Sequence, residues 1–136
     1  MITFTIAGQA KPLKRHRVAK GGRMYDPSYK DKKDIMLQIS QYKPDQPFTG
    51  DIRLSIRFTM RIPKSWYRTG KYSHLLKDRY KRIRNHSRKP DLSNLLKLIE
   101  DILQPSFYVD DSQICQIYAE KMYGENPNTA VIIQEI

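Results

Sequence analysis

Four aspartates in the C-terminal third of the chain have the side-chain type and spacing for metal-assisted chemistry on phosphate esters: Asp91, Asp101, Asp110 and Asp111. Hard cations such as Mg²⁺ prefer oxygen ligands. Phosphodiester hydrolysis uses such an ion to polarise the phosphate, activate water and stabilise the leaving oxygen. Because carboxylates brought together repel one another without a cation, a cluster of these side chains predicts a metal centre.

Each of these acids also has an ordinary structural explanation. Asp91 could cap a helix, and Asp101 could pair with Lys97 four residues earlier on the same helix face. Asp110 and Asp111 could form a surface turn. The metal hypothesis therefore rests on the combination of acids within a basic chain, and not on any one residue.

Lys97 is the cation among these acids. Its compact charge could bind the scissile phosphate or the charge that develops during displacement, although a solvated helix lysine fits the spacing equally well. Glu100, at the edge of the same polar arc, is expected to be solvated.

The residues from 91 to 103 form the clearest predicted element, an amphipathic helix that Pro105 ends. At 100° per residue its apolar side chains fall in one arc, and Ser93, Asn94, Lys97, Glu100 and Asp101 fall in the opposite arc. The helix would thus present Asp91 at its start and the polar residues along its exposed side.

The rest of the pattern predicts a single α+β domain over residues 1–136, with two layers and the helices packed on one face of a mixed β-sheet. Alternation over 52–62 indicates a half-buried strand with a basic outer face. Residues 9–25 and 83–90 are expected to be basic connections. The other predicted elements are strands over 2–7, 113–123 and 129–135, a helix from Asp26–Pro27 to about Gln41, and a helix over about 66–82.

The charge is unevenly distributed along the chain. The net charge is +11, but residues 1–90 hold 23 Lys and Arg against 6 Asp and Glu, whereas residues 91–136 hold 2 against 8. A strongly basic front part indicates a polyanionic partner.

Two cationic stretches, 11–23 and 64–89, are the expected phosphate contacts. Trp66, Tyr67, Tyr72 and Tyr80 lie between these cations and could stack on unpaired bases, with Trp66 expected to be buried. The residues predicted to bind DNA are Lys11, Lys14, Arg15, Arg17, Arg23, Lys64, Arg68, Lys81, Arg82, Arg84, Arg88 and Lys89.

The histidines, the cysteine and the apolar runs give little support to a histidine metal site, a disulfide or a membrane location. His16, His74 and His86 show no ligand spacing and are expected at the surface. Cys115 is the one cysteine, expected to pack within a strand, so no intrachain disulfide can form and a reducing cytoplasm is the expected location. No apolar run approaches the ~20 residues that span a bilayer. The sequence opens with apolar residues and then turns basic, which is the reverse of a signal peptide, so none is expected.

The stretch KPDLSNLLKLIEDILQPSFYVDDSQI, from Lys89 to Ile114, resembles the RusA family of Holliday-junction resolvases. The pattern of that family is K-P-D-x-D-N-x-x-K-x-x-x-D-x-L, followed by D-D-S-x-I after a short loop. Agreement extends to the basic segment after Gly8, the I-P-x-S-W motif that ends at Trp66, and Lys121 and Tyr123 near the end.

The resemblance implies a RusA-like fold and a homodimer that nicks two strands of a four-way DNA junction, in recombination and repair, with Mg²⁺ or Mn²⁺. By position, Asp91 and Asp111 would be metal-binding catalytic acids. Asp110 and Asp101 would be supporting metal ligands, Lys97 the essential cation, and Asn94 a residue that orients the site.

Ser93 departs from the family pattern, which has an acid at this position. Ser93 could coordinate directly or through water, or Glu100 or Asp101 could compensate, and a working or weakened nuclease would result. Alternatively, the chain could bind branched DNA without cutting it. A third hypothesis is a basic RNA-binding module whose acids are structural, but no aromatic motif of such modules is present.

Overall fold

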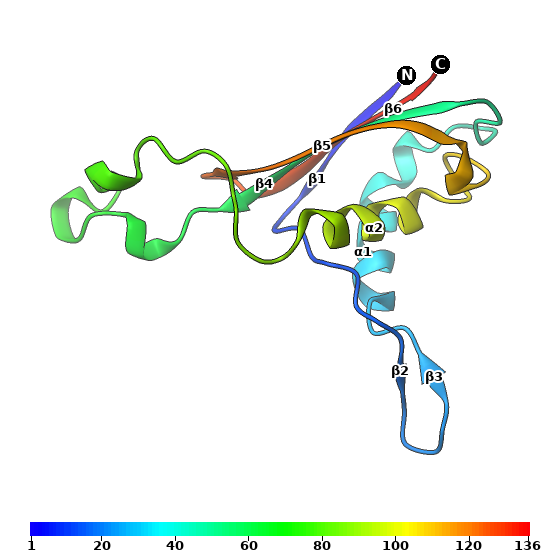
Figure 1. Cartoon of the computed structure of the whole chain (residues 1–136), viewed down its shortest axis with the longest axis horizontal. Helices are drawn as coiled ribbons and strands as arrows, with labels where there is room; N and C mark the ends of the chain where they lie inside the picture. The colour runs from blue at the N-terminus through cyan, green and yellow to red at the C-terminus, as the bar shows by residue number, and fades with distance from the viewer.

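The computed structural model describes all residues from 1 to 136, and it places two helices on one face of a four-stranded sheet (Figure 1). The strand order is β1-β6-β4-β5, with β4 and β5 parallel and the other pairs antiparallel. The predicted α+β architecture with a mixed sheet is therefore confirmed. The elements of this body are β1 (Ile2–Ala7), α1 (Tyr29–Ile39), β4 (Ile52–Arg61), α2 (Leu92–Leu103), β5 (Ile114–Gly124) and β6 (Asn128–Glu135).

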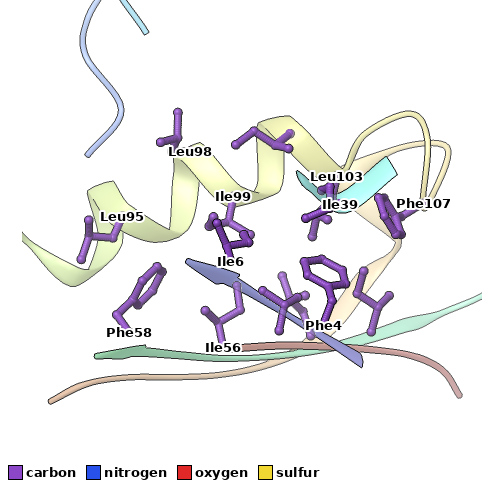
Figure 2. Close-up of a cluster of buried hydrophobic side chains, with 14 of the residues drawn as sticks. Phe4, Ile6, Ile39, Ile56, Phe58, Leu95, Leu98, Ile99, Leu103 and Phe107 are labelled. Carbon is purple, nitrogen blue, oxygen red and sulfur yellow. The ribbon is translucent and has the colours of Figure 1, made fainter. Parts of the chain in front are cut away.

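The core lies between β4 and α2, as their periodicities predict. All five alternate apolar residues of β4 from Ile52 to Met60 are buried, while Arg53, Arg57 and Arg61 are exposed on the uncovered face. Burial along α2 follows the predicted apolar arc, and Figure 2 shows these side chains meeting those of β1 and β4. The buried residues of α2 are Leu95, Leu98, Ile99, Ile102 and Leu103.

The segment before α2 covers the free edge of β5. Asn85 forms an isolated antiparallel bridge with Met122, the amide of His86 donates to Lys121 O at 3.0 Å, and the amide of Tyr123 donates to Arg84 O at 2.8 Å. Pairing of this kind protects an exposed strand edge, and it ties the chain just before Asp91 to the sheet.

Residues 9–25 contain a small hairpin that the sequence pattern does not reveal. Its strands are β2 (Arg17–Val18) and β3 (Met24–Tyr25), and Gly21 and Gly22 form the turn with φ of 96° and 84°. We call residues 11–25 the basic finger, and Figure 1 shows it projecting away from the sheet. The helix that follows begins at Tyr29, two residues later than predicted; Ser28 makes no side-chain cap, and Asp26 Oδ1 accepts the Ser28 amide at 2.9 Å in the turn before the helix, as an N-cap residue does.

The helix predicted over 66–82 is wrong. The segment has only short 3-10 turns, Lys64–Trp66, Gly70–Tyr72 and Asp78–Tyr80. Only Trp66 in it is buried, so no apolar stripe supports a long helix. We call residues 64–90 the basic arm; Figure 1 shows its green portion extending beyond the end of the sheet.

Trp66 anchors the basic arm and is 5% exposed, as predicted. Its ring stacks on Tyr80 at 4.5 Å between centroids and packs against Tyr123 of β5 at 4.6 Å. Tyr80 is thus a packing residue, whereas Tyr72 remains exposed.

Two minor expectations are corrected. His86 is half-buried against Tyr123, and burial, with Lys121 and Arg88 nearby, lowers its pKa. Cys115 is exposed rather than packed, because β5 is an edge strand at this point. No helix in the structure has both the length and the apolar character that a membrane crossing requires.

Candidate active site

Asp91 stands at the N-terminus of α2 with a carboxylate that the chain leaves free. Its backbone has extended geometry, and its main-chain oxygen accepts the amides of Asn94 and Leu95, each at 3.1 Å. The side chain makes no capping hydrogen bond. The capping explanation therefore does not account for this aspartate, whose exposed oxygens remain available to a ligand.

A hollow of about 560 Å³ opens beside Asp91. The start of the basic finger forms one side, where the amide of Leu13 donates to Asn94 O at 3.1 Å. The lining residues are Gln9, Ala10, Pro12, Lys89, Pro90, Asp91 and Asn94. The predicted catalytic acid thus lies between the two predicted phosphate-binding segments.

Asp110 and Asp111 lie at the other end of α2. The amide of Asp111 donates to Gln104 Oε1 at 3.0 Å, and Gln104 is the C-terminal cap of the helix. Asp110 begins the short turn Asp111–Gln113; its amide donates to Gln113 Oε1 at 2.8 Å. The side chain of Gln113 in turn donates to the main-chain oxygens of Phe48 and Gly50, so this loop is well anchored.

The acids at this end influence one another. The neighbouring carboxyls of Asp110 and Asp111 compete for one proton, which lowers the pKa of Asp110 and raises the pKa of Asp111. Burial raises the pKa of Glu100, and the charges of Asp111 and Asp101 add to the effect. Such mutual repulsion is what a bound cation would relieve.

Asp91 and Asp111 are too far apart within one chain to share an ion. They flank the 12 residues of α2, which span about 18 Å at about 1.5 Å per residue. No three acidic, histidine or cysteine side chains are placed to hold one metal together. The expected convergence of the acids is thus not found inside a single chain.

The polar face of α2 connects these two ends. Lys97 is exposed and makes no ion pair, so the predicted alternative of pairing with Asp101 does not occur. Asp101 instead pairs with Lys32 of α1 at 3.4 Å, and Lys32 also binds Asp26 at 2.8 Å. Ser93 is exposed one turn from Lys97, and neither Glu100 nor Asp101 reaches its end of the helix.

Most of the predicted DNA-binding cations are exposed and free of acidic partners. The exceptions are Lys11, paired with Asp31, and Arg68 and Lys81, which both pair with Asp78. Arg88 lies over the Trp66 ring at 5.9 Å. The unpaired members are Lys14, Arg15, Arg17, Arg23, Lys64, Arg82, Arg84, Arg88 and Lys89.

Sequence reasoning missed two contributors to this region. Glu100 is half-buried beside Asp111 rather than solvated. Lys121 enters the sequence pattern only as part of a motif, yet its Nζ donates to Arg88 O and Pro90 O, directly before Asp91. A lysine at an inward-facing position of a strand was the available signal for the second.

Comparisons with known proteins identify the family of this chain. The uncharacterized protein YqaN of Bacillus subtilis (strain 168) is 29% identical over 140 residues, which cover 99% of this chain and 96% of that protein. The family model described as Endodeoxyribonuclease RusA matches residues 7–134. Because this match spans nearly the whole length, the chain belongs to the RusA family of endodeoxyribonucleases.

Proposed function

We propose that the protein is a structure-selective endodeoxyribonuclease that resolves four-way DNA junctions by paired nicking, as a homodimer, with Mg²⁺ or Mn²⁺. The observation that carries the proposal is the free carboxylate of Asp91, set between two basic segments in a chain of this family. Unpaired cations on the finger and the arm support binding to a branched polyanion.

The donor atoms suit a hard divalent cation, because they are all oxygens. Asp91 and Asp111 are the proposed catalytic ligands, with Asp110 and Asp101 in support. A cation held there would neutralise charge on the scissile phosphate and favour attack by water. Asn94 and Ser93 lie in the first turn of α2 near Asp91, where we assign them supporting roles.

The separation of Asp91 from Asp111 favours active sites shared between two protomers. Under a two-fold axis, a contact made by one residue with another is repeated with the roles exchanged. Antiparallel approach of the two α2 helices would bring Asp91 of each protomer toward Asp111 of the partner subunit. Two equivalent sites would result, one for each strand that is cut.

Lys97 has its own role in this proposal. It is exposed on the α2 face between the two acidic ends and has no acid bound to it. Its ammonium would contact the scissile phosphate and offset the charge that builds up in the transition state. We expect Lys97→Met to lower the cleavage rate more than the affinity for a junction.

The direct test is incubation of the protein with a synthetic four-way junction, with and without Mg²⁺. Symmetrical nicks that need the metal are expected, and Asp91→Asn and Asp111→Asn should each abolish them. Glu125→Asn, in the exposed turn between β5 and β6, is the control. Cleavage that survives Asp111→Asn would refute the assignment of that residue.

Shared sites are tested by a heterodimer of Asp91→Asn and Asp111→Asn protomers, purified through two different tags. If each site uses both chains, one site has lost both acids and the other is intact, so nicking returns. If each chain holds its own site, the heterodimer is as inactive as the two mutant homodimers.

Ser93 favours one alternative, a protein that binds junctions and does not cut them. A hydroxyl is a neutral ligand and holds Mg²⁺ less strongly than a carboxylate does. This alternative predicts tight, salt-sensitive binding without nicking, and Ser93→Asp should then create activity. Under the main proposal, Ser93→Asp instead lowers the Mg²⁺ concentration required, whereas Ser40→Asp at the end of α1 changes nothing.

A further inference from the structure

Lys121 is a cation on the side of β5 that faces the core. The register places it beside Phe58 of β4, which is fully buried under the helices. Residues paired in this way point to the same face of a sheet. A lysine there loses hydration, and burial lowers its pKa despite the nearby charge of Asp91, so its position calls for specific partners.

Those partners are main-chain oxygens directly before Asp91. The ammonium of Lys121 donates to Arg88 O at 2.5 Å and to Pro90 O at 2.6 Å. Its own main-chain oxygen accepts the amide of His86 at 3.0 Å. Lys121 therefore holds the last residues of the basic arm to the sheet by both its side chain and its backbone.

This attachment sets where the Asp91 carboxylate lies. Asp91 is held on one side by its hydrogen bonds to the first turn of α2 and on the other by the attachment of Pro90 to Lys121. Its side chain has no hydrogen bond within the chain. Because backbone position alone directs this carboxylate, a shift of Pro90 would move it.

A direct contact between Lys121 and DNA is the competing explanation. Two of the three ammonium protons already bind carbonyl oxygens, and the side chain is half-buried. The cations around it on the arm, Arg84, Arg88 and Lys89, are exposed and free of acids. The geometry thus suits anchoring better than phosphate binding.

We propose that Lys121 is a positioning residue that anchors the Arg88–Pro90 backbone and thereby places Asp91 for the cleavage step. The proposal rests on the proposed function, in which Asp91 is a ligand of the catalytic ion. Residues that hold a metal ligand in place without contacting the metal typically contribute about 10- to 100-fold to activity or metal affinity.

The test compares Lys121→Met with Lys43→Met, the same change on an exposed lysine after α1. Three quantities are measured: the single-turnover cleavage rate, the junction Kd in Ca²⁺, and hydrogen exchange of the amides of Asn94 and Leu95. We expect Lys121→Met to cut about 10- to 100-fold more slowly, with Kd unchanged within about twofold. Both amides should exchange faster while the β4 amides stay protected.

Lys121→Arg keeps the charge and can still donate to both carbonyls, so it should retain more activity than the methionine variant. Wild-type cleavage and exchange in Lys121→Met would overturn the proposal, as would a weaker Kd with an unchanged rate at saturation. If Lys121→Met does not fold, Lys121→Gln, which keeps a shorter and uncharged donor group, is judged by the same criteria. If the wild-type protein itself does not cut in Mg²⁺ or Mn²⁺, the proposed function fails. The anchoring role of Lys121 is then judged by hydrogen exchange alone, and unchanged exchange in Lys121→Met overturns it.

Discussion

Glu100 is the residue whose surroundings depart furthest from what its position on a polar helix arc suggests. It is half-buried near the C-terminal end of α2, with Asp101 next to it and Asp111 across the short loop. A carboxylate in that position is easier to protonate than one in water. Its environment therefore opposes ionisation in the absence of a cation.

The raised pKa of Glu100 makes stability depend on pH with a definite sign. The folded chain holds this proton more tightly than the unfolded chain, so stability decreases as pH rises from the ordinary value of 4.5 through the raised pKa. Glu100→Gln removes that loss, so at pH 7 we expect a more stable protein, by under about 1 kcal/mol because the group is partly solvated.

Thermal unfolding followed by circular dichroism from pH 3.5 to pH 8 measures this effect. The advantage of Glu100→Gln should disappear below pH 4.5, where the wild-type carboxyl is also neutral. Glu125→Gln, in an exposed turn, is the matched control and should leave the stability unchanged at every pH. A destabilised Glu100→Gln protein at pH 7 would contradict the assigned sign.

At the scale of elements, three attachments hold the basic arm to the body: one small aromatic cluster, the pairing to β5 and the Lys121 ammonium. Trp66 is its centre, stacked on Tyr80 and packed on Tyr123. Truncation of a buried tryptophan costs about 3–5 kcal/mol in a core. Here the loss falls on a peripheral segment, which can open locally while the sheet and helices remain folded.

We therefore expect Trp66→Ala to release the arm without unfolding the domain. Trypsin should cut the variant at arm lysines and arginines at least about tenfold faster, since the population of the locally open arm rises as the free energy that holds it closed falls. Far-UV circular dichroism should change little. Tyr72→Ala, an exposed aromatic of the same arm, serves as the control; equal protection in both variants would show that Trp66 is not the anchor.

The elements that were predictable from sequence are those that local periodicity determines. α2 and β4 bury their apolar residues as predicted because each has a long stripe facing the core. The arm and the finger have no such stripe. Contacts with a distant strand, such as Asn85 to Met122, determine the shape of the arm, and its cations and aromatics give no local sign of this.

The candidate site shows the same division. Residue types and motif spacing indicated Asp91, Lys97 and Asp111, but the length of α2 keeps the two aspartates at opposite ends. Sequence spacing does not state whether two residues on either side of a helix meet in the same chain or across an interface. Lys121 escaped notice because its partners are backbone oxygens, which carry no sequence signature.

At the scale of the whole molecule, charge and shape act together. The net charge of +17 on residues 1–90 is carried largely by two projections, the finger and the arm, while the acids gather on α2 and the strands that follow. Both projections join the body at the N-terminal end of α2, beside Asp91. Under the proposed function, the junction is bound through its phosphates at these projections, away from the acids at the C-terminal end of α2.

The salt dependence of junction binding tests how much of this binding the arm supplies. Each cation that neutralises a phosphate of duplex DNA adds about 0.9 to the slope of log K against log salt concentration. Arg82, Arg84 and Lys89 are exposed and unpaired, so replacing all three with alanine should lower the slope by up to about 2.7. Affinity in Ca²⁺ should fall for junction and plain duplex alike.

The control replaces Lys30, Lys33 and Lys43, a like number of exposed cations on and after α1. Electrophoretic titrations at several salt concentrations give both slopes; equal slopes for the two triple variants would mean that the arm does not lie on the DNA, because net charge alone would then account for the change.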